Sequence, residues 1–325
     1  MLILVCSCHF FVVILQPKKQ LKITILFNQY YMRRERSAFF ILFIWVLLMA
    51  LGTTIAYFLW TILPDRNAVS SLKALQAMQV LFLFILPALA VAWIFQEKPA
   101  QWLGLTTFPA PKVWLYAFLL MLVMVPGINL LSYWNQQLSL PACLSGVEEQ
   151  MKLLEEKSAE LLRQFMNTTS FAGILVNLGL MALLPAIGEE LTFRGVLLHT
   201  LTTRTQNRTP HLAIWVTAII FSFVHFQFYG FVPRMLMGAL LGYMLCWTGS
   251  LWIAMLMHFT NNAIVTILYF ICLRGGYDTA TLDAIGSGDT LWLGILSIIV
   301  SVIGIYLFRR SLTMSNASSR TSSGS

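Results

Sequence analysis

Long apolar stretches are the feature that most constrains what this chain can fold into. About eight of them have the length that a helix needs to cross a bilayer, near 38–63, 73–95, 113–134, 171–199, 212–228, 232–248, 250–270 and 290–308. The chain is 58% hydrophobic and only 10% charged, whereas a soluble domain carries about 25% charged residues. We therefore predict an all-α, polytopic membrane helix bundle of about eight transmembrane helices plus one amphipathic surface helix.

The charged residues lie mainly in the short connections between these stretches. This placement excludes nucleic acid as a partner despite the net charge of +8, because the cations form neither a basic face nor a tail. Loop cations mark the cytoplasmic side of a membrane protein. With eight crossings, this side receives Arg33, Arg34, Arg36, Lys98, Lys112, Arg204, Arg208, Arg309 and Arg310. We predict a protein integral to a bacterial cytoplasmic membrane, with both termini cytoplasmic and the glutamates of 145–167 outside.

The remaining segments divide the chain further. Residues 1–31 read poorly as a signal peptide, since no basic residues precede their apolar part. We interpret them as an N-terminal extension upstream of a start at Met32, followed by the first three transmembrane helices within 32–144. Segment 145–167 mixes apolar residues with glutamates at helical spacing, which predicts an amphipathic helix on the membrane surface.

The second half of the chain holds the other predicted units. Residues 168–270 form the candidate catalytic core, and 271–310 contain the last transmembrane helix. Within the core, the long helix 171–199 should break or kink near Pro185. The two short spans that follow, joined through Gln227–Pro233, should form a tight helical hairpin. The serine-rich segment 311–325 predicts a disordered tail.

Ionisable residues inside the apolar stretches are the candidate functional groups, because lipid excludes charge. They are Glu189, Glu190, Arg194, His225 and His258, with Asn262 beside them. Glu190 and Arg194 are four residues apart and can pair on one helix face, while Glu189 lies about 100° around the helix from Glu190. One carboxylate can therefore be neutralised while the other faces a different surface.

Depth in the membrane gives a second reason to group these residues. Counting from the 200–211 connection at 1.5 Å per residue, Glu189 lies about 16 Å and His225 about 20 Å inside. Counting from Gly249–Ser250, His258 lies about 13 Å and Asn262 about 20 Å inside. Three helices thus bring polar groups to one layer, which predicts a single site approached most easily from the cytoplasmic half.

The chemistry open to such a cluster is hydrolysis of an amide. A carboxylate beside a neutral histidine can activate water as a general base, and an asparagine amide with a second imidazole can stabilise an oxyanion. The same groups, Glu189, His225 and His258, are also candidate ligands for a divalent metal such as zinc, whose bound water would be the nucleophile. The residues alone leave both routes open, so the cofactor is either a metal or none.

The order EExxxR, FxxxH and HxxxN resembles the three motifs of the CPBP family, which includes CAAX prenyl endopeptidases of the Ras-converting-enzyme type. Here the motifs are Glu189–Arg194, Phe221–His225 and His258–Asn262. The resemblance covers about 170–270 and implies an intramembrane endopeptidase that acts on a membrane-associated protein or peptide.

The resemblance further implies that Glu189 and His225 activate the attacking water and that His258 and Asn262 stabilise the oxyanion. Glu190 with Arg194 would support the motif helix. Two other classes remain as alternatives. An ion- or proton-coupled transporter would use intramembrane Glu and His residues as a proton relay, and a bacteriocin-immunity-type membrane protein would keep the fold without catalysis.

Overall fold

Helices account for all the regular structure from Ala38 onward in the computed structural model, which describes residues 4–6, 9–11, 37–204 and 210–322. Two short strands, β1 (Leu4–Cys6) and β2 (His9–Phe11), pair antiparallel ahead of the helices. The rest of the predicted extension 1–31, and Met32 itself, lie outside the described residues. The predicted all-α membrane helix bundle is confirmed.

Seven helices in the described part of the chain are long and apolar enough to cross a membrane. The first four are α2 (Ala38–Thr61), α3 through η1 to α4 (Val69–Phe95), α6 (Pro111–Gln136) and α8 to α10 (Phe171–Thr202). The other three are η5 with α12 (Phe228–Thr248), α13 (Leu251–Gly275) and η6 with the first part of α15 (Gly288–Leu312). The eighth predicted span, 212–228, is the shorter helix α11 (His211–Phe223). At 13 residues, α11 covers about 20 Å, less than the hydrocarbon thickness of about 30 Å.

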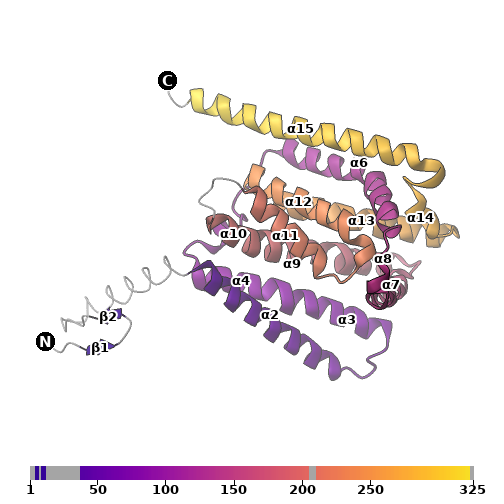
Figure 1. The fold of residues 1–325 in the computed structure, drawn as a ribbon, viewed down its shortest axis with the longest axis horizontal. Helices are drawn as coiled ribbons and strands as arrows, with labels where there is room; N and C mark the ends of the chain where they lie inside the picture. The colour runs from indigo at the N-terminus through magenta and orange to yellow at the C-terminus, as the bar shows by residue number, and fades with distance from the viewer. Residues whose placement is uncertain (1–3, 7–8, 12–36, 205–209, 323–325) are drawn as a thin grey trace.

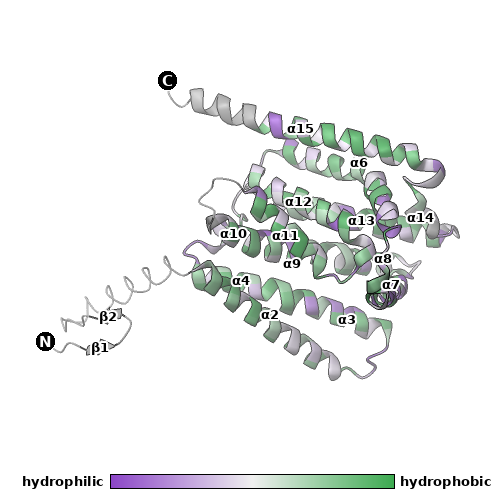
Figure 2. Cartoon of the chain, in the orientation of Figure 1, coloured by the Kyte–Doolittle hydropathy of each residue, from purple (hydrophilic) through white to green (hydrophobic). Residues whose placement is uncertain are grey.

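The helices form layers, with α2, α3 and α4 on one side, α6 and α15 on the other, and α9, α11, α12 and α13 between them (Figure 1). Apolar residues dominate the long helices throughout these layers (Figure 2). Two buried apolar clusters hold the layers together, and α12 and α13 contribute to both of them. The layer between the two outer ones therefore contributes to both apolar clusters, and polar groups on its inner faces, such as His258, are buried.

Helix α7 (Ser145–Met166) is the predicted surface helix, and most of its residues are exposed. In Figure 1 it is seen end-on at one end of the bundle, while α10 (His199–Arg204) lies at the other end. Short elements complete the connections: α5 (Pro99–Trp102), η2 (Ala142–Leu144), α14 (Ala280–Ala284) and η6 (Gly288–Thr290).

The long helix predicted to break or kink near Pro185 does not break there and continues through it with altered winding. It passes through α8 (Phe171–Asn177), the π-helical η3 (Leu178–Leu183), α9 (Leu184–Glu189), the π-helical η4 (Glu190–Leu198) and α10 (His199–Arg204). Proline has no N–H to donate to the carbonyl of Met181. Asn262 Nδ2 of α13 donates to that carbonyl at 3.2 Å instead, so a neighbouring helix supplies the lost bond.

Helices α11 and α12 form the predicted hairpin. If a larger residue replaced Gly238, its Cβ atom would lie only 3.1 Å from the Phe221 side chain. A Cβ atom added at Gly242 would likewise lie 3.1 Å from the Ile214 side chain. The two helices run antiparallel in close contact because these glycines leave room between them. Gly249, in the left-handed conformation with φ 66°, then ends α12 and turns the chain into α13.

The carboxyl-terminal prediction differs from the structure. Helix α15 (Leu291–Ser322) continues into the serine-rich segment 311–325, which was predicted to be disordered. Serine is a moderate helix former, and adding residues to an existing helix costs far less than starting one. Residues 323–325 lie outside the described part.

Candidate active site

The buried pair of Glu190 and Arg194 lies at the start of η4. Arg194 Nη1 donates to Glu190 Oε1 at 2.8 Å, and both side chains are at most 1% exposed. The second arm of the guanidinium, Nη2, donates to the carbonyl of Gly238 in α12 at 2.9 Å. The Arg194 guanidinium also lies 4.5 Å from the centre of the Phe221 ring of α11. The ion pair predicted from helical spacing therefore ties η4 to the α11–α12 hairpin.

Glu190 also orients His258, one of the two motif histidines. His258 of α13 is almost fully buried, and its Nδ1–H donates to Glu190 Oε1 at 2.8 Å. In a neutral imidazole with a proton on Nδ1, the other nitrogen carries a lone pair. That nitrogen, His258 Nε2, faces Glu189 Oε2 at 3.8 Å.

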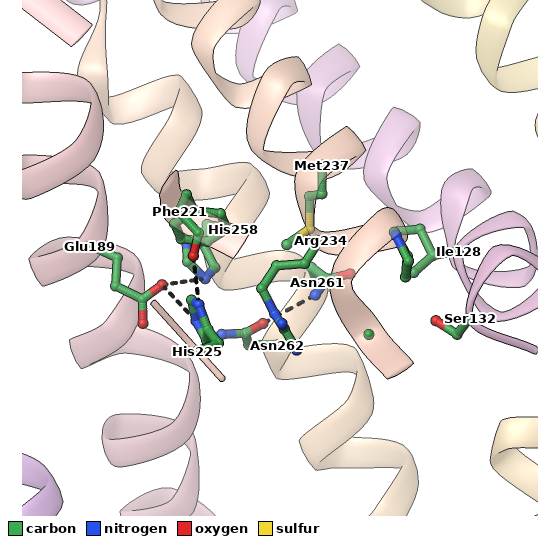
Figure 3. Close-up of a pocket in the computed structure, with 12 residues that line it drawn as sticks. Ile128, Ser132, Glu189, Phe221, His225, Arg234, Met237, His258, Asn261 and Asn262 are labelled. Carbon is green, nitrogen blue, oxygen red and sulfur yellow. Dashed lines mark hydrogen bonds and ion pairs between the residues drawn. The ribbon is translucent and has the colours of Figure 1, made fainter. Parts of the chain in front are cut away.

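His225 is held in the same manner by a different acceptor. Its Nδ1–H donates to the carbonyl of Phe221 at 2.7 Å, one turn earlier in the chain. Its Nε2 lies 3.9 Å from Glu189 Oε2. Both imidazoles therefore present Nε2 to the same carboxylate oxygen, as the dashed lines of Figure 3 show. Neither separation is a direct hydrogen bond, and each leaves room for a bridging water.

One position differs from the sequence-based expectation. His225 was placed inside the span 212–228, but α11 ends at Phe223 and His225 lies in the turn that follows. Phe226 has φ 53°, in the left-handed region that a right-handed helix cannot continue through. The turn nevertheless brings His225 to Glu189, which His258 also faces.

A pocket of about 250 Å³ contains these groups. Its walls include the four candidate catalytic residues together with Arg234, Asn261, Phe221 and Ser132. Asn262 Oδ1 accepts from Asn261 Nδ2 at 3.1 Å, and with Nδ2 bonded to Met181 one amide N–H of Asn262 remains for another acceptor. All the residues predicted to form one site thus lie around one pocket or, for Glu190 and Arg194, directly behind it.

The pocket extends toward the α7 end of the bundle. Ser132 near the end of α6, Gly230 of η5 (Phe228–Gly230) and Arg234 at the start of α12 (Phe231–Thr248) line this side. Helix α10 lies at the opposite end of the bundle (Figure 1). The lining residues Ser132, Gly230 and Arg234 thus favour an approach from the α7 end, whereas the sequence predicts an approach from the half of the 200–211 connection.

Arg234 and Asn135 were not among the predicted site residues. Arg234 Nη2 donates to Gln227 Oε1 at 2.7 Å, and its side chain projects among the pocket residues (Figure 3). Asn135, near the end of α6, is 1% exposed and bonds to the segment that lines the pocket. A polar residue within an apolar span was the available signal for Asn135, but it belongs to no spaced motif.

The distances between the candidate ligand atoms show whether a metal ion would fit this site. Two ligands of a tetrahedral zinc ion lie about 3.3 Å apart, less than the 3.8 and 3.9 Å between Glu189 Oε2 and the two Nε2 atoms. Within the described ranges, no group of three or more His, Cys, Asp or Glu side chains has an arrangement that could hold a metal ion. The three candidate ligands do not fit a tetrahedral metal site as they stand.

Comparison with known proteins supports the resemblance predicted from the motifs. Residues 171–264 match the family model of Rce1-like type II CAAX prenyl endopeptidases. A segment of 88 residues is 33% identical to an uncharacterized protein, YpbD, of Bacillus subtilis (strain 168). This similarity covers 26% of the present chain and 41% of the relative. No solved structure matches the chain.

Proposed function

From the similarity of residues 171–264 to Rce1-like CAAX prenyl endopeptidases, we propose that this protein is an intramembrane endopeptidase. It would hydrolyse a peptide bond of a membrane-associated protein or peptide, and the lipid bilayer would be its other partner. The observation that carries the proposal is the convergence of two imidazole Nε2 atoms on Glu189 Oε2, at 3.8 and 3.9 Å, within one pocket.

In the proposed reaction a water molecule binds between Glu189 and His225. Glu189 and the Nε2 lone pair of His225 are both acceptors, so together they can orient the water and take its proton as it attacks the carbonyl carbon. The bond from Nδ1 of His225 to Phe221 holds the imidazole in the required tautomer. The proton then passes to the leaving amine, and the carboxylate is regenerated.

The opposite wall of the pocket would stabilise the oxyanion. Asn262 has one amide N–H that is not used in its bond to Met181. His258 can donate from Nε2 when its imidazole carries both protons, with Nδ1 held by Glu190. Donors of this kind, fixed before the reaction, are worth about 100- to 1,000-fold each in the rate of acyl transfer. Glu190 and Arg194 act by holding His258 and the motif helix in place.

The test is cleavage of a fluorogenic membrane peptide by the purified protein in liposomes. Glu189→Ala and His225→Ala should each lower kcat by at least about 100-fold, the usual contribution of a general base. His211→Ala is the matched control, because His211 bonds to Tyr243 on the side of the α11–α12 hairpin away from the pocket. Full activity in either site variant, with both variants correctly inserted, would disprove the mechanism.

Two further measurements distinguish the proposed mechanism from a metal-dependent protease and from a transporter. A chelator added to the wild-type assay should leave the rate unchanged if the water is activated by Glu189 and His225 alone, and should abolish it if a metal such as zinc is required. Ion-dependent uptake by the same liposomes, lost in Glu189→Ala, would instead indicate a coupled transporter. Comparison of the membrane proteomes of wild-type and Glu189→Ala cells would then identify the substrate and whether it is prenylated.

A further inference from the structure

The segment that directly follows the turn with His225 is held by a residue from another helix. Asn135 Nδ2 donates to the carbonyl of Phe228 at 2.9 Å, and its Oδ1 accepts from the backbone N–H of Val232 at 3.0 Å. One amide side chain thus bridges the start of η5 (Phe228–Gly230) and the first turn of α12. Because Asn135 is only 1% exposed, loss of either bond would leave a buried polar group unpaired.

A second bond restrains the same segment from the opposite side. Ser222 Oγ, at the end of α11, donates to the carbonyl of Phe231 at 2.7 Å. The segment Phe228–Val232 is therefore fixed to α6 through Asn135 and to α11 through Ser222. It lines the pocket at Gly230 and leads directly into Arg234.

The backbone needs this restraint because of the residue after His225. Phe226 has φ 53°, and it is the only residue other than glycine with positive φ in the part of the chain that the structure describes. For a bulky residue this conformation is strained and persists only where surrounding contacts enforce it. Its own side chain supplies little of that enforcement, since it is 67% exposed.

We propose that Asn135 is a positioning residue of the active site, which clamps the Phe228–Val232 segment so that the strained turn at Phe226 presents His225 to Glu189. This inference rests on the proposed function for its link to catalysis. Its mechanical part, the clamp, stands on the hydrogen bonds and the backbone conformation alone. Without the clamp, the turn would relax toward an unstrained conformation and carry the His225 imidazole out of place.

The first experiment compares Asn135→Ala with Asn129→Ala in the peptide-cleavage assay. Asn129 lies on the same helix and also donates through Nδ2 to a carbonyl, that of Leu282, but it does not line the pocket. Asn135→Ala should lower kcat by about 100-fold, the cost of displacing a catalytic group by about 1 Å. Asn129→Ala should keep kcat near that of the wild type.

The second experiment asks whether removing the strain replaces the clamp. Glycine adopts positive φ without penalty, so Phe226→Gly in the Asn135→Ala background should recover kcat by about tenfold. Phe226→Ala removes the same ring but keeps the strained backbone, and it should recover nothing. A residue with only a general structural role would give no such difference between glycine and alanine.

Hydrogen exchange of residues 224–232 in the purified protein tests the clamp without any substrate. Asn135→Ala should speed exchange in this segment, while Asn129→Ala should not. If the wild type cleaves no peptide but exchange follows this pattern, the proposed function fails and the clamp remains. If Asn135→Ala cleaves at the wild-type rate, or exchange is unchanged, the role of Asn135 is disproved and the proposed function is untouched.

Discussion

Arg194 carries its charge into the bundle interior with two acceptors and one aromatic ring around it. It donates to Glu190 and to the carbonyl of Gly238, and it stacks near Phe221. A charge buried in this way is tolerated only while its partners remain. The residue therefore acts on the site through structure, since it does not line the pocket itself and contacts Glu190, which orients His258, and the pocket residue Phe221.

Arg194→Ala should lower the free energy of unfolding by about 3–5 kcal/mol, because it leaves the Glu190 carboxylate buried without its partner. Arg163→Ala is the control, since Arg163 forms an exposed pair with Glu160 on α7, and such pairs contribute about 0–1 kcal/mol. Thermal and denaturant unfolding in detergent would measure both. Equal effects in the two variants would contradict the structural role assigned to Arg194.

Helical spacing predicted the Glu190–Arg194 pair because residues four apart meet on one face whatever surrounds them. It could not predict that Glu190, rather than Glu189, bonds to His258 Nδ1. That contact depends on how α13 packs against η4, a distance of 68 residues in the chain. Asn135 was not predicted for the same reason. Its partners, Phe228 and Val232, lie 93 and 97 residues later in the chain, and only tertiary packing brings them to it.

At the scale of elements, the winding of the motif helix was the least predictable feature. Glu189 ends α9 and Glu190 begins the π-helical η4, so the two carboxylates lie at a change of helical pitch. Sequence periodicity assumes one pitch throughout, and π-helical turns depend on neighbours that satisfy the displaced backbone bonds. Wide turns of this type are frequent at functional sites, which agrees with the position of the pocket.

Helix α7 carries a partly buried carboxyl group, that of Glu155. Glu155 Oε2 is buried without a hydrogen-bond partner among the described residues, and burial raises the pKa of this carboxyl above its ordinary value, although the Arg234 charge and the backbone of Tyr229 oppose the shift. A raised pKa means that Glu155 favours the folded state below pH 4.5 and loses this contribution as pH rises through the folded pKa.

Glu155→Gln should therefore stabilise the docked α7 at pH 7, because it removes a carboxylate that must ionise in a shielded place. The gain should shrink as the pH falls toward and below 4.5, because protonation then neutralises the wild-type carboxyl as well. Unfolding measured across this pH range, with hydrogen exchange of α7, would report both effects. Glu156→Gln, an exposed position on the same helix, should change neither, and destabilisation by Glu155→Gln at pH 7 would refute the expectation.

At the scale of the whole molecule, the bundle has two different ends. One end carries α7, η5 and the pocket residues Gly230 and Arg234, while α10 lies at the other end (Figure 1). Hydropathy predicted the helices and their order because apolar length is a local property. The sequence predicted an approach from the half of the 200–211 connection, whereas Gly230 and Arg234 line the pocket toward α7, because the chain leaves α11 at Phe223 and turns there.

The distribution of positive charge predicts that α7 lies outside the cytoplasm, and native Cys143 can test this. It is exposed and lies in η2, directly before α7. In a chain whose other four cysteines are replaced by serine, a membrane-impermeant maleimide should label Cys143 in intact cells. Ser311→Cys, near the opposite end in α15, should be labelled only after the cells are opened. The reverse pattern would place the pocket opening in the cytoplasm and overturn the predicted orientation, and with it the compartment from which a substrate must come.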